Sequence, residues 1–278
     1  MTEKKLLGIV GSYRNVGNAE IVTKAVAEKL EGWELSMIRL PKLSLQPCKA
    51  CYACLIPGKK CNLPDDMQWL IERILEADAV IIAAPNYVLG PAGMVKMMAD
   101  RALQASYCHE KFRTKKTAVA LTLGREDYRG YADTALAAQA GALGLRVAGV
   151  ELFFGTHPGE VALEESFDEK ISRLAVSLLA DAGEAPGAPG RCPRCHSDLF
   201  RIREDSLECA VCKSRARQTG DKLDFFFFHH EFGEQGLEEH LKWLLGKKEE
   251  YAFIKDKLAY IQKRYRGGNW LTPPGKNE

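Results

Sequence analysis

The stretch LLGIVGSYRNVGNAEIVTKAV, residues 6–26, predicts a buried strand, a polar loop with two glycines and a helix in direct succession. Four further apolar runs follow along the chain: LSMIRL (35–40), AVIIAAP (79–85), TAVALTL (117–123) and RVAGVELFF (146–154). Apolar runs that alternate with helical patterns are typical of βαβ units around a parallel sheet. Several runs are apolar at nearly every position, so helices are expected to cover both faces of the sheet. We predict an α/β, three-layer sandwich with a five-stranded parallel sheet over residues 1–182.

Composition excludes several classes of protein. The 278 residues are 46% hydrophobic and 27% charged, as in ordinary globular proteins. A formal net charge of +2 gives no strong field for nucleic acid or an anionic membrane, so neither is an expected partner. No window approaches the ~18 apolar residues of a spanning helix, and KKLLGIVGSYR is too short for a secretory signal. We expect a cytoplasmic protein.

The second half of the chain predicts three further parts. AGEAPGAPGR, residues 182–191, is rich in Gly and Pro and indicates a linker over 183–190. Two close cysteine pairs then define a small module over 191–228, in which Phe225–Phe228 read as a buried strand or docking segment. Residues 229–278 form a tail whose apolar positions recur at helical spacing, which predicts one or two amphipathic helices with a break at Gly246.

The loop after the first strand offers ligands for an anion. Ser12 supplies a hydroxyl, Arg14 a forked cation and Asn18 an amide, and Gly17 leads into the N-terminus of a helix, which favours negative charge. The spacing matches neither the dinucleotide fingerprint nor the nucleotide-binding P-loop. The same residues are also compatible with a helix cap beside a solvated arginine.

Here the chain resembles the flavodoxin-like, NADPH-dependent FMN reductase superfamily, whose first loop reads G-S-x-R-x-x-x-N-[ST]. Ser12, Arg14 and Asn18 match this pattern, whereas Ala19 replaces the hydroxyl residue, which removes one hydrogen bond to a phosphate worth about 1 kcal/mol. A second block, APNYVLGPAGMVKMMADR at 84–101, resembles the family's P-x-Y segment that ends in Asp100 and Arg101.

The resemblance implies an FMN site on consecutive sheet loops. Pro85 and Gly90 set a turn with exposed amides, while Asn86 and Tyr87 offer polar and flat surfaces to the isoalloxazine ring. The loop after the fourth strand contributes Gly124, where the backbone can approach a ligand closely.

Four of the nine cysteines lie in QPCKACYACLIPGKKCN, residues 46–62, as C-x2-C-x2-C-x6-C. Thiolates at successive intervals of three favour a [4Fe–4S] cluster, whereas structural zinc prefers two separated pairs. Zinc and free thiols remain alternatives for Cys48, Cys51, Cys54 and Cys61. Asp65 and Asp66, which follow, read as charges at the start of a helix.

With this motif, residues 4–180 resemble the iron–sulfur flavoproteins of anaerobic archaea and bacteria. The resemblance implies one FMN and one [4Fe–4S] cluster per subunit, assembly into a dimer or tetramer, and electron exchange with a ferredoxin-like carrier. FMN then passes electrons to an acceptor. No side chain is predicted to act as a catalytic acid or base.

Cys192, Cys195, Cys209 and Cys212 form C-x2-C-x13-C-x2-C, two knuckles joined by a segment long enough for one hairpin. This spacing predicts a zinc ribbon, with a rubredoxin-like iron site as the alternative. Two other functions also remain open for the whole chain. One is an NAD(P)H-dependent FMN or quinone reductase with zinc or no metal at the first cysteines; the other is a non-catalytic zinc-ribbon adaptor.

Overall fold

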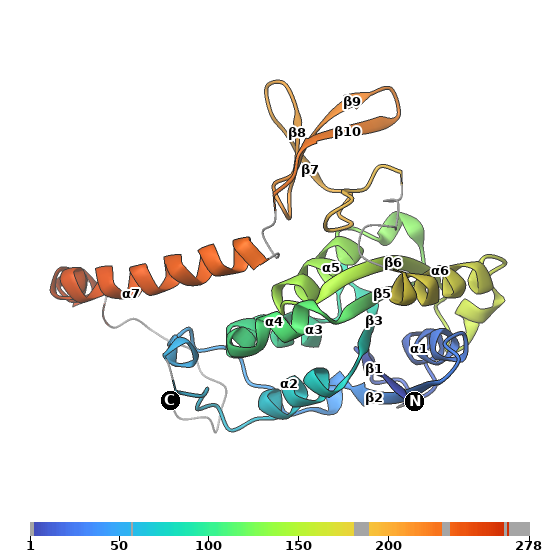
Figure 1. Ribbon diagram of the computed structural model, residues 1–278, viewed down its shortest axis with the longest axis horizontal. Helices are drawn as coiled ribbons and strands as arrows, with labels where there is room; N and C mark the ends of the chain where they lie inside the picture. The colour runs from blue at the N-terminus through green and yellow to red at the C-terminus, as the bar shows by residue number, and fades with distance from the viewer. Residues whose placement is uncertain (1–2, 57, 181–188, 230–233, 264–265, 267–278) are drawn as a thin grey trace. The chain divides into compact units, whose positions relative to one another are not determined.

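The computed structural model describes residues 3–56, 58–180, 189–229, 234–263 and 266 (Figure 1). The chain divides into two compact units, residues 1–237 and 238–278. Residues 183–188 of the expected linker lie outside the described residues, and the domain boundaries drawn from the sequence stay a prediction.

A five-stranded parallel sheet forms the centre of the first unit, as the apolar runs predict. Its strands occur in the order β2-β1-β3-β5-β6, which is flavodoxin-like. The bounds are β1 Lys4–Val10, β2 Trp33–Arg39, β3 Ala79–Tyr87, β5 Lys116–Leu123 and β6 Arg146–Phe154. A two-residue strand, β4 (Gly90–Pro91), pairs antiparallel with the end of β3. The carboxyl ends of all five long strands therefore meet at one edge, where open parallel sheets bind ligands.

Helices cover both faces of the sheet (Figure 1). On one face lie α1 (Asn18–Glu28) and α6 (Phe167–Leu179); on the other lie α2 (Met67–Glu76), α3 (Gly93–Ala99), α4 (His109–Arg113) and α5 (Ala132–Ala142). Short 3-10 turns occupy Leu40–Lys42, Ala53–Leu55, Ala102–Cys108, Glu126–Tyr128 and Glu160–Leu163. Ile81 and Ile82 of β3 are both fully buried, one in each core, which explains the unbroken apolar run. Each such side chain stabilises the fold by about 1.5–3 kcal/mol.

The ribbon module forms a four-stranded antiparallel sheet in the order β10-β9-β8-β7. Its strands are β7 (Phe200–Ile202), β8 (Leu207–Cys209), β9 (Arg215–Thr219) and β10 (Lys222–Phe227), so the expected hairpin between the cysteine pairs is present. The small core holds the four cysteines with Phe200, Val211 and Phe225.

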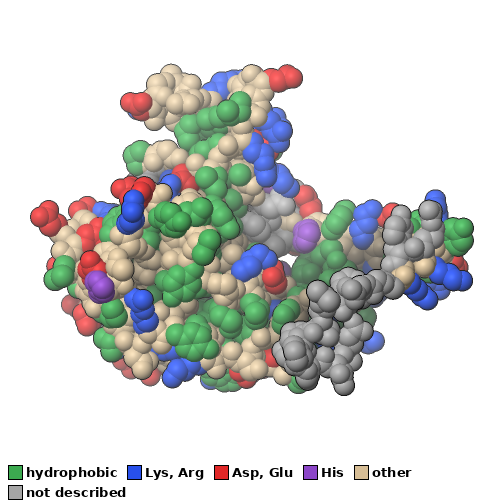
Figure 2. All heavy atoms as spheres, turned by 180° about the vertical axis from the view of Figure 1, so that it is seen from behind, with side chains coloured by type: hydrophobic (Ala, Val, Ile, Leu, Met, Phe, Trp, Pro, Cys, Tyr) green, Lys and Arg blue, Asp and Glu red, His purple; other side chains and the backbone are tan. Residues whose placement is uncertain are grey.

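Phe225–Phe228 were predicted to be a buried strand or a docking segment; a strand is present, since β10 includes Phe225, Phe226 and Phe227, but the predicted burial is wrong for most of the segment and docking stays a prediction. Phe226, Phe227 and Phe228 are 49%, 46% and 43% exposed, because a core built around four cysteines leaves little apolar surface for them to cover. Figure 2 shows hydrophobic and basic side chains together on this module, at the top of the view, and Arg217 lies 4.7 Å above the Phe226 ring.

The described part of the tail contains one helix, α7 (Glu234–Lys263), of 30 residues. The predicted break at Gly246 is wrong: the helix continues through it, since a glycine inside a helix costs only about 0.5–1 kcal/mol. Among the described residues, no helix is both long enough and apolar enough to cross a membrane.

Candidate functional site

Four loops gather at the carboxyl edge of the sheet: residues 11–17, 84–91, 124–131 and 155–159. Gly11 donates its backbone N–H to Ala83 O across 2.8 Å, which holds the first loop against β3 just before the second loop. Gly124 lies so close to the fourth loop that a Cβ there would stand 2.7 Å from Thr156 Oγ1. The close backbone approach expected at Gly124 is therefore made by a neighbouring loop of the chain.

The first loop keeps a hydroxyl and a guanidinium side by side. Ser12 is buried, and its Oγ accepts a hydrogen bond from Arg14 N at 3.2 Å. Arg14 Nη1 donates to Thr156 O at 2.9 Å, so the side chain is held along the edge of the loop. The first N–H groups of α1 have no partner within the helix and point toward this loop. These groups fit a phosphate.

Asn18 forms hydrogen bonds to the backbone of the fourth loop. Its Nδ2 donates to Gly155 O and its Oδ1 accepts from Gly159 N, both at 2.9 Å. Gly17 precedes it as the N-cap of α1 with an extended backbone. The structure thus places Asn18 as a bridge between the first and fourth loops, beside Ser12 and Arg14.

The second loop is a tight hairpin, residues 85–91, called here the β3–β4 hairpin. Pro85 O accepts from Ala92 N at 3.0 Å, and Tyr87 pairs with Gly90 across the turn. The two turn residues, Val88 and Leu89, both have left-handed backbones, with φ of 51° and 65°. This conformation is unfavourable for a β-branched residue, and such strain concentrates at functional sites.

Asn86 carries an atom that fits a bound ligand. Its Nδ2 donates to Tyr128 O at 2.7 Å, while its Oδ1 is buried without a hydrogen-bond partner. Buried polar atoms are rarely unpaired, so an N–H group of a bound molecule is the expected partner. A flavin ring offers such a group, and Tyr87 beside it is 54% exposed and presents a flat ring.

The first cysteine set surrounds one cavity of about 480 Å³. Cys48 and Cys51 are exposed, and Cys54 and Cys61 are half-buried. Ala50 donates its N–H to Cys48 Sγ at 3.4 Å. Ala50 and Tyr52 have left-handed φ values of 49° and 54°, and alternating backbone handedness forms the concave N–H surfaces that bind anions and Fe–S clusters.

A buried ion pair lies against the cysteine loop and stabilises it. Arg101 pairs with Asp65, and both side chains are 1% exposed. Arg101 also donates to Cys61 Sγ at 3.4 Å and to Gln46 O at 2.9 Å. Burial alone would raise the pKa of Asp65, but hydrogen bonds from Arg101 and from the Gln46 and Met67 amides hold that pKa below its ordinary value. From the sequence, Asp65 was predicted only to be a charge at the start of a helix, and its ion pair with Arg101 was missed.

Helix α3 connects the two regions. It begins at Gly93, directly after the β3–β4 hairpin, and ends at Ala99, before Asp100 and Arg101 of the cavity wall. Seven helical residues span only about 10 Å. The hairpin predicted to hold a flavin and the cavity lined by four thiols are therefore consecutive features of one short segment.

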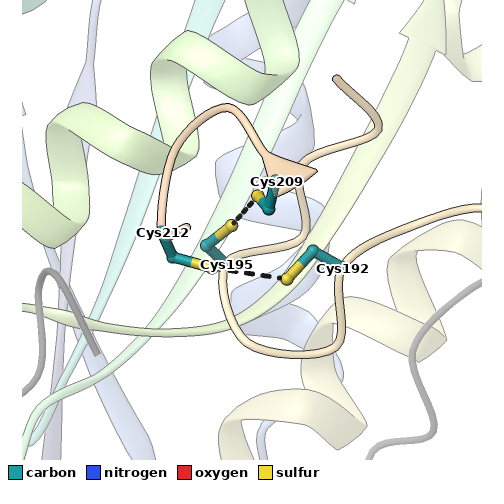
Figure 3. Close-up of side chains that lie close together, drawn as sticks. All are labelled: Cys192, Cys195, Cys209 and Cys212. Carbon is teal, nitrogen blue, oxygen red and sulfur yellow. Dashed lines mark hydrogen bonds between the residues drawn. The ribbon is translucent and has the colours of Figure 1, made fainter. Parts of the chain in front are cut away.

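The ribbon cysteines converge much more tightly (Figure 3). All four Sγ atoms lie within 4.8 Å of one another, with Cys192 and Cys212 3.5 Å apart and Cys195 and Cys209 3.4 Å apart. Tetrahedral zinc with Zn–S bonds near 2.3 Å requires sulfur separations of about 3.8 Å. Hydrogen bonds with Cys192 and Cys195 lower the pKa of Cys212 below its ordinary value. This set fits one metal ion.

The two cysteine sets therefore differ in kind. Among the described residues, the ribbon cysteines are the only group of three or more ligating side chains close enough to share a single ion. The first four thiols line a cavity of larger size and are not part of such a group.

Sequence comparison finds a matching family model and several curated relatives. The model of a family described as NADPH-dependent FMN reductase matches residues 4–157. An iron–sulfur flavoprotein of Archaeoglobus fulgidus is 33% identical over 188 residues, which cover 65% of this chain and 81% of that relative.

Two further similarities include the ribbon. A flavone synthase of Aspergillus candidus is 25% identical over 288 residues, with 86% of this chain and 87% of the relative covered. A solved structure described as flavone reductase superposes with a TM-score of 0.68 at 20% identity, covering 97% of this chain and 99% of the other. The structural match shows a shared fold across nearly the whole chain.

Proposed function

The chain belongs to the NADPH-dependent FMN reductase family and is a flavin-dependent oxidoreductase, and from this premise we propose that it is an iron–sulfur flavoprotein that transfers electrons between a ferredoxin-like carrier and an acceptor. Cys48, Cys51, Cys54 and Cys61 hold a [4Fe–4S] cluster in this proposal. When bound, the cluster supplies one-electron transfer and FMN supplies its conversion to two-electron chemistry. The family match favours this function over a non-catalytic adaptor.

One observation carries the proposal: four thiols line a single cavity that lies one short helix away from the β3–β4 hairpin. Helix α3 starts directly after the hairpin, and the residues that follow its last turn line the cavity. Other residues of the chain form hydrogen bonds to the cysteine ligands. Arg101 and the Ala50 amide direct N–H groups at cysteine sulfurs, and hydrogen bonds to sulfur are a means by which proteins set cluster potentials.

FMN is proposed to bind at the four loops of the sheet edge. Ser12, Arg14, Gly17 and the start of α1 hold the phosphate. Pro85, Asn86, Tyr87 and Gly90 face the ring, with Gly124 behind them. Asn18 supports this arrangement by fixing the first loop to residues 155–159.

A ferredoxin-like carrier fits the surface around the cysteine cavity. Lys49, Lys59 and Lys60 are exposed on the cysteine loop, as are Cys48 and Cys51. Asp65 is neutralised by Arg101, and Asp100, which also lines the cavity, pairs with Lys96. The exposed lysines therefore complement an acidic carrier. Lys59→Glu with Lys60→Glu is expected to slow reduction by such a carrier, most strongly at low salt; Lys29→Glu on the distant end of α1 serves as the control.

A homodimer or homotetramer is part of the proposal, since exposed ligands of a cluster are protected when a neighbouring subunit covers them. Light scattering of the purified, cluster-loaded protein measures the subunit number. A monomer at all concentrations contradicts this part.

Zinc is proposed for the ribbon, because the sulfur separations are close to those of a tetrahedral Zn–S4 site. The metal contributes folding free energy to a module with a very small apolar core.

Anaerobic purification tests the central proposal. About four irons per chain, equivalent labile sulfide, one FMN and a paramagnetic signal after reduction are expected. A flavin spectrum without iron would instead indicate an NAD(P)H-dependent FMN or quinone reductase.

A planar aromatic acceptor is a second candidate for the reaction partner of FMN. The flavone synthase similarity extends over most of both chains, ribbon included. Tyr87, Tyr128 and Tyr131 are 54%, 60% and 54% exposed on the two ring-side loops, where they can stack on a flat substrate. Turnover of a flavone by the reduced, FMN-loaded protein tests it, with a non-aromatic aliphatic enone as the control substrate.

A further inference from the structure

The ribbon is joined to the flavin side of the sheet by charged contacts. Its first knuckle, residues 191–198, contains Cys192 and Cys195. Arg191 Nη2 donates to Asp133 Oδ2 at 2.6 Å, and Asp133 is fully buried in the first turn of α5. Arg191 Nη1 also donates to His196 O at 2.8 Å, so the same side chain closes the knuckle on itself.

Asp198, at the other end of the knuckle, makes a second set of contacts. Arg129 Nη2 donates to Asp198 Oδ2 at 2.5 Å, and Thr134 Oγ1 donates to Asp198 Oδ1 at 3.1 Å. Arg129 also lies 3.7 Å from Asp133 Oδ2. Two carboxylates and two guanidiniums thus alternate across the contact, none of them more than about a third exposed.

Arg129 belongs to the β5–α5 loop, residues 124–131, which faces the proposed flavin ring. The backbone of this loop is bound to the β3–β4 hairpin: Asn86 Nδ2 donates to Tyr128 O at 2.7 Å, and Tyr131 N donates to Leu89 O at 3.0 Å. At Gly130 a Cβ would stand 2.4 Å from Leu89 Cβ, so the two loops pack without room for a side chain.

We infer that the cysteine ribbon positions the flavin-binding loops, with Arg191 and Asp198 as positioning residues that transmit the order of the metal-bound knuckle to the β5–α5 loop and, through it, to Asn86. This inference rests on the proposed FMN site.

The physical reason lies in the knuckle's construction. Metal bound to Cys192 and Cys195 fixes the short segment that carries Arg191 and Asp198 on either side of these ligands. Without metal, the knuckle loses this constraint, and Arg191 is no longer held against Asp133. The remaining cation near Asp133 among the contacts described above is Arg129, at 3.7 Å. A buried carboxylate with a weakened partner is unfavourable, so α5 and the preceding loop become less ordered.

The test compares Asp198→Ala with Asp205→Ala in the full, metal-loaded chain. Asp205 is 76% exposed and its nearest cation, Arg217 at 3.8 Å, lies within the ribbon, so its replacement leaves the contact intact. Asp198→Ala is expected to weaken FMN binding about fivefold or more, and to speed amide hydrogen exchange over 124–131. Asp205→Ala should change neither.

Equal FMN affinity and equal exchange in the two variants would overturn the inference. If wild-type protein binds no FMN, the proposed function fails, and exchange over 124–131 still decides whether the ribbon orders this loop. If Asp198→Ala does not fold, a charge reversal takes its place: Arg129→Asp weakens FMN binding, and adding Asp198→Arg restores it. Absence of that rescue overturns the inference as well.

Discussion

The guanidinium of Arg101 donates a hydrogen bond to Cys61 Sγ across 3.4 Å while it pairs with the buried carboxylate of Asp65. The same guanidinium therefore donates hydrogen bonds to a buried carboxylate and to a sulfur atom at the wall of the cysteine cavity. The loop that carries Cys61 is attached to the end of α3 by this side chain.

Arg101→Met is expected to lower the free energy of unfolding by about 3–5 kcal/mol, because it leaves Asp65 buried and unpaired. Urea unfolding measures the change. Lys96→Met is the matched control, since Lys96 and Asp100 are 60% and 48% exposed and such pairs are worth at most about 1 kcal/mol. Equal losses in both variants contradict the role given to Arg101. Adding Asp65→Asn to Arg101→Met should recover part of the stability.

Arg14→Ala should weaken FMN binding about 10- to 100-fold, the equivalent of a charge-assisted hydrogen bond of about 1.5–3 kcal/mol. Quenching of flavin fluorescence gives the dissociation constant. Arg73→Ala on α2, where Arg73 pairs with Glu76 at the surface, controls for the loss of a positive charge. A similar effect of both changes would remove Arg14 from the phosphate site.

Acid sensitivity follows from Glu20. Burial alone would raise its pKa, but hydrogen bonds from Lys24, Arg39 and the Val16 amide lower it from 4.5 to about 2. The unfolded chain therefore takes up a proton first as pH falls, and this part of the stability is lost between about pH 4.5 and about pH 2. Glu20→Gln should flatten the decrease in urea midpoint over that window. An unchanged pH slope in this variant refutes the assignment.

The two cysteine sets should lose metal separately. Cys54→Ser is expected to reduce iron content and leave zinc at about one per chain, whereas Cys195→Ser removes zinc and leaves iron. Elemental analysis of anaerobically purified protein measures both metals, with wild type prepared in parallel. Loss of iron from the Cys195 variant alone would reverse the assignment.

The hairpin tip offers a test of backbone strain. Val88 is 87% exposed and has φ of 51°, so Val88→Gly removes strain without removing a packed side chain and should raise the free energy of unfolding by about 1 kcal/mol. Val176→Gly, at an exposed position inside α6, should have the opposite sign because glycine weakens helices. Thermal unfolding distinguishes the two; a loss of stability in both contradicts the strain argument.

Local pattern was enough to predict the sheet. Ile81 and Ile82 show why: adjacent apolar residues face opposite cores, so the run itself reports two covered faces. The ribbon was equally predictable because ligand spacing fixes two knuckles. Gly246 and Phe226 were misjudged, since a helix tolerates one glycine and a metal-centred core buries few aromatic rings.

The contacts that support the sites could not be read from the sequence. Arg101 and Asp65 are 36 positions apart, and Arg191 and Asp133 are 58 positions apart. Nothing in their local sequence distinguishes these charges from solvated ones. The pairing depends on where α3, α5 and the knuckle are brought together by the fold.

The burial of Asp133 beneath Arg191 also sets a limit on dissection of the gene. A shortened protein that stops before residue 191 would retain every flavin-side loop, but the Asp133 carboxylate would lose its ion-pair partner. Expression trials should therefore use endpoints beyond the second cysteine pair. A variant of this chain without the ribbon would need a neutral side chain at position 133, because the partner of that buried carboxylate would be gone.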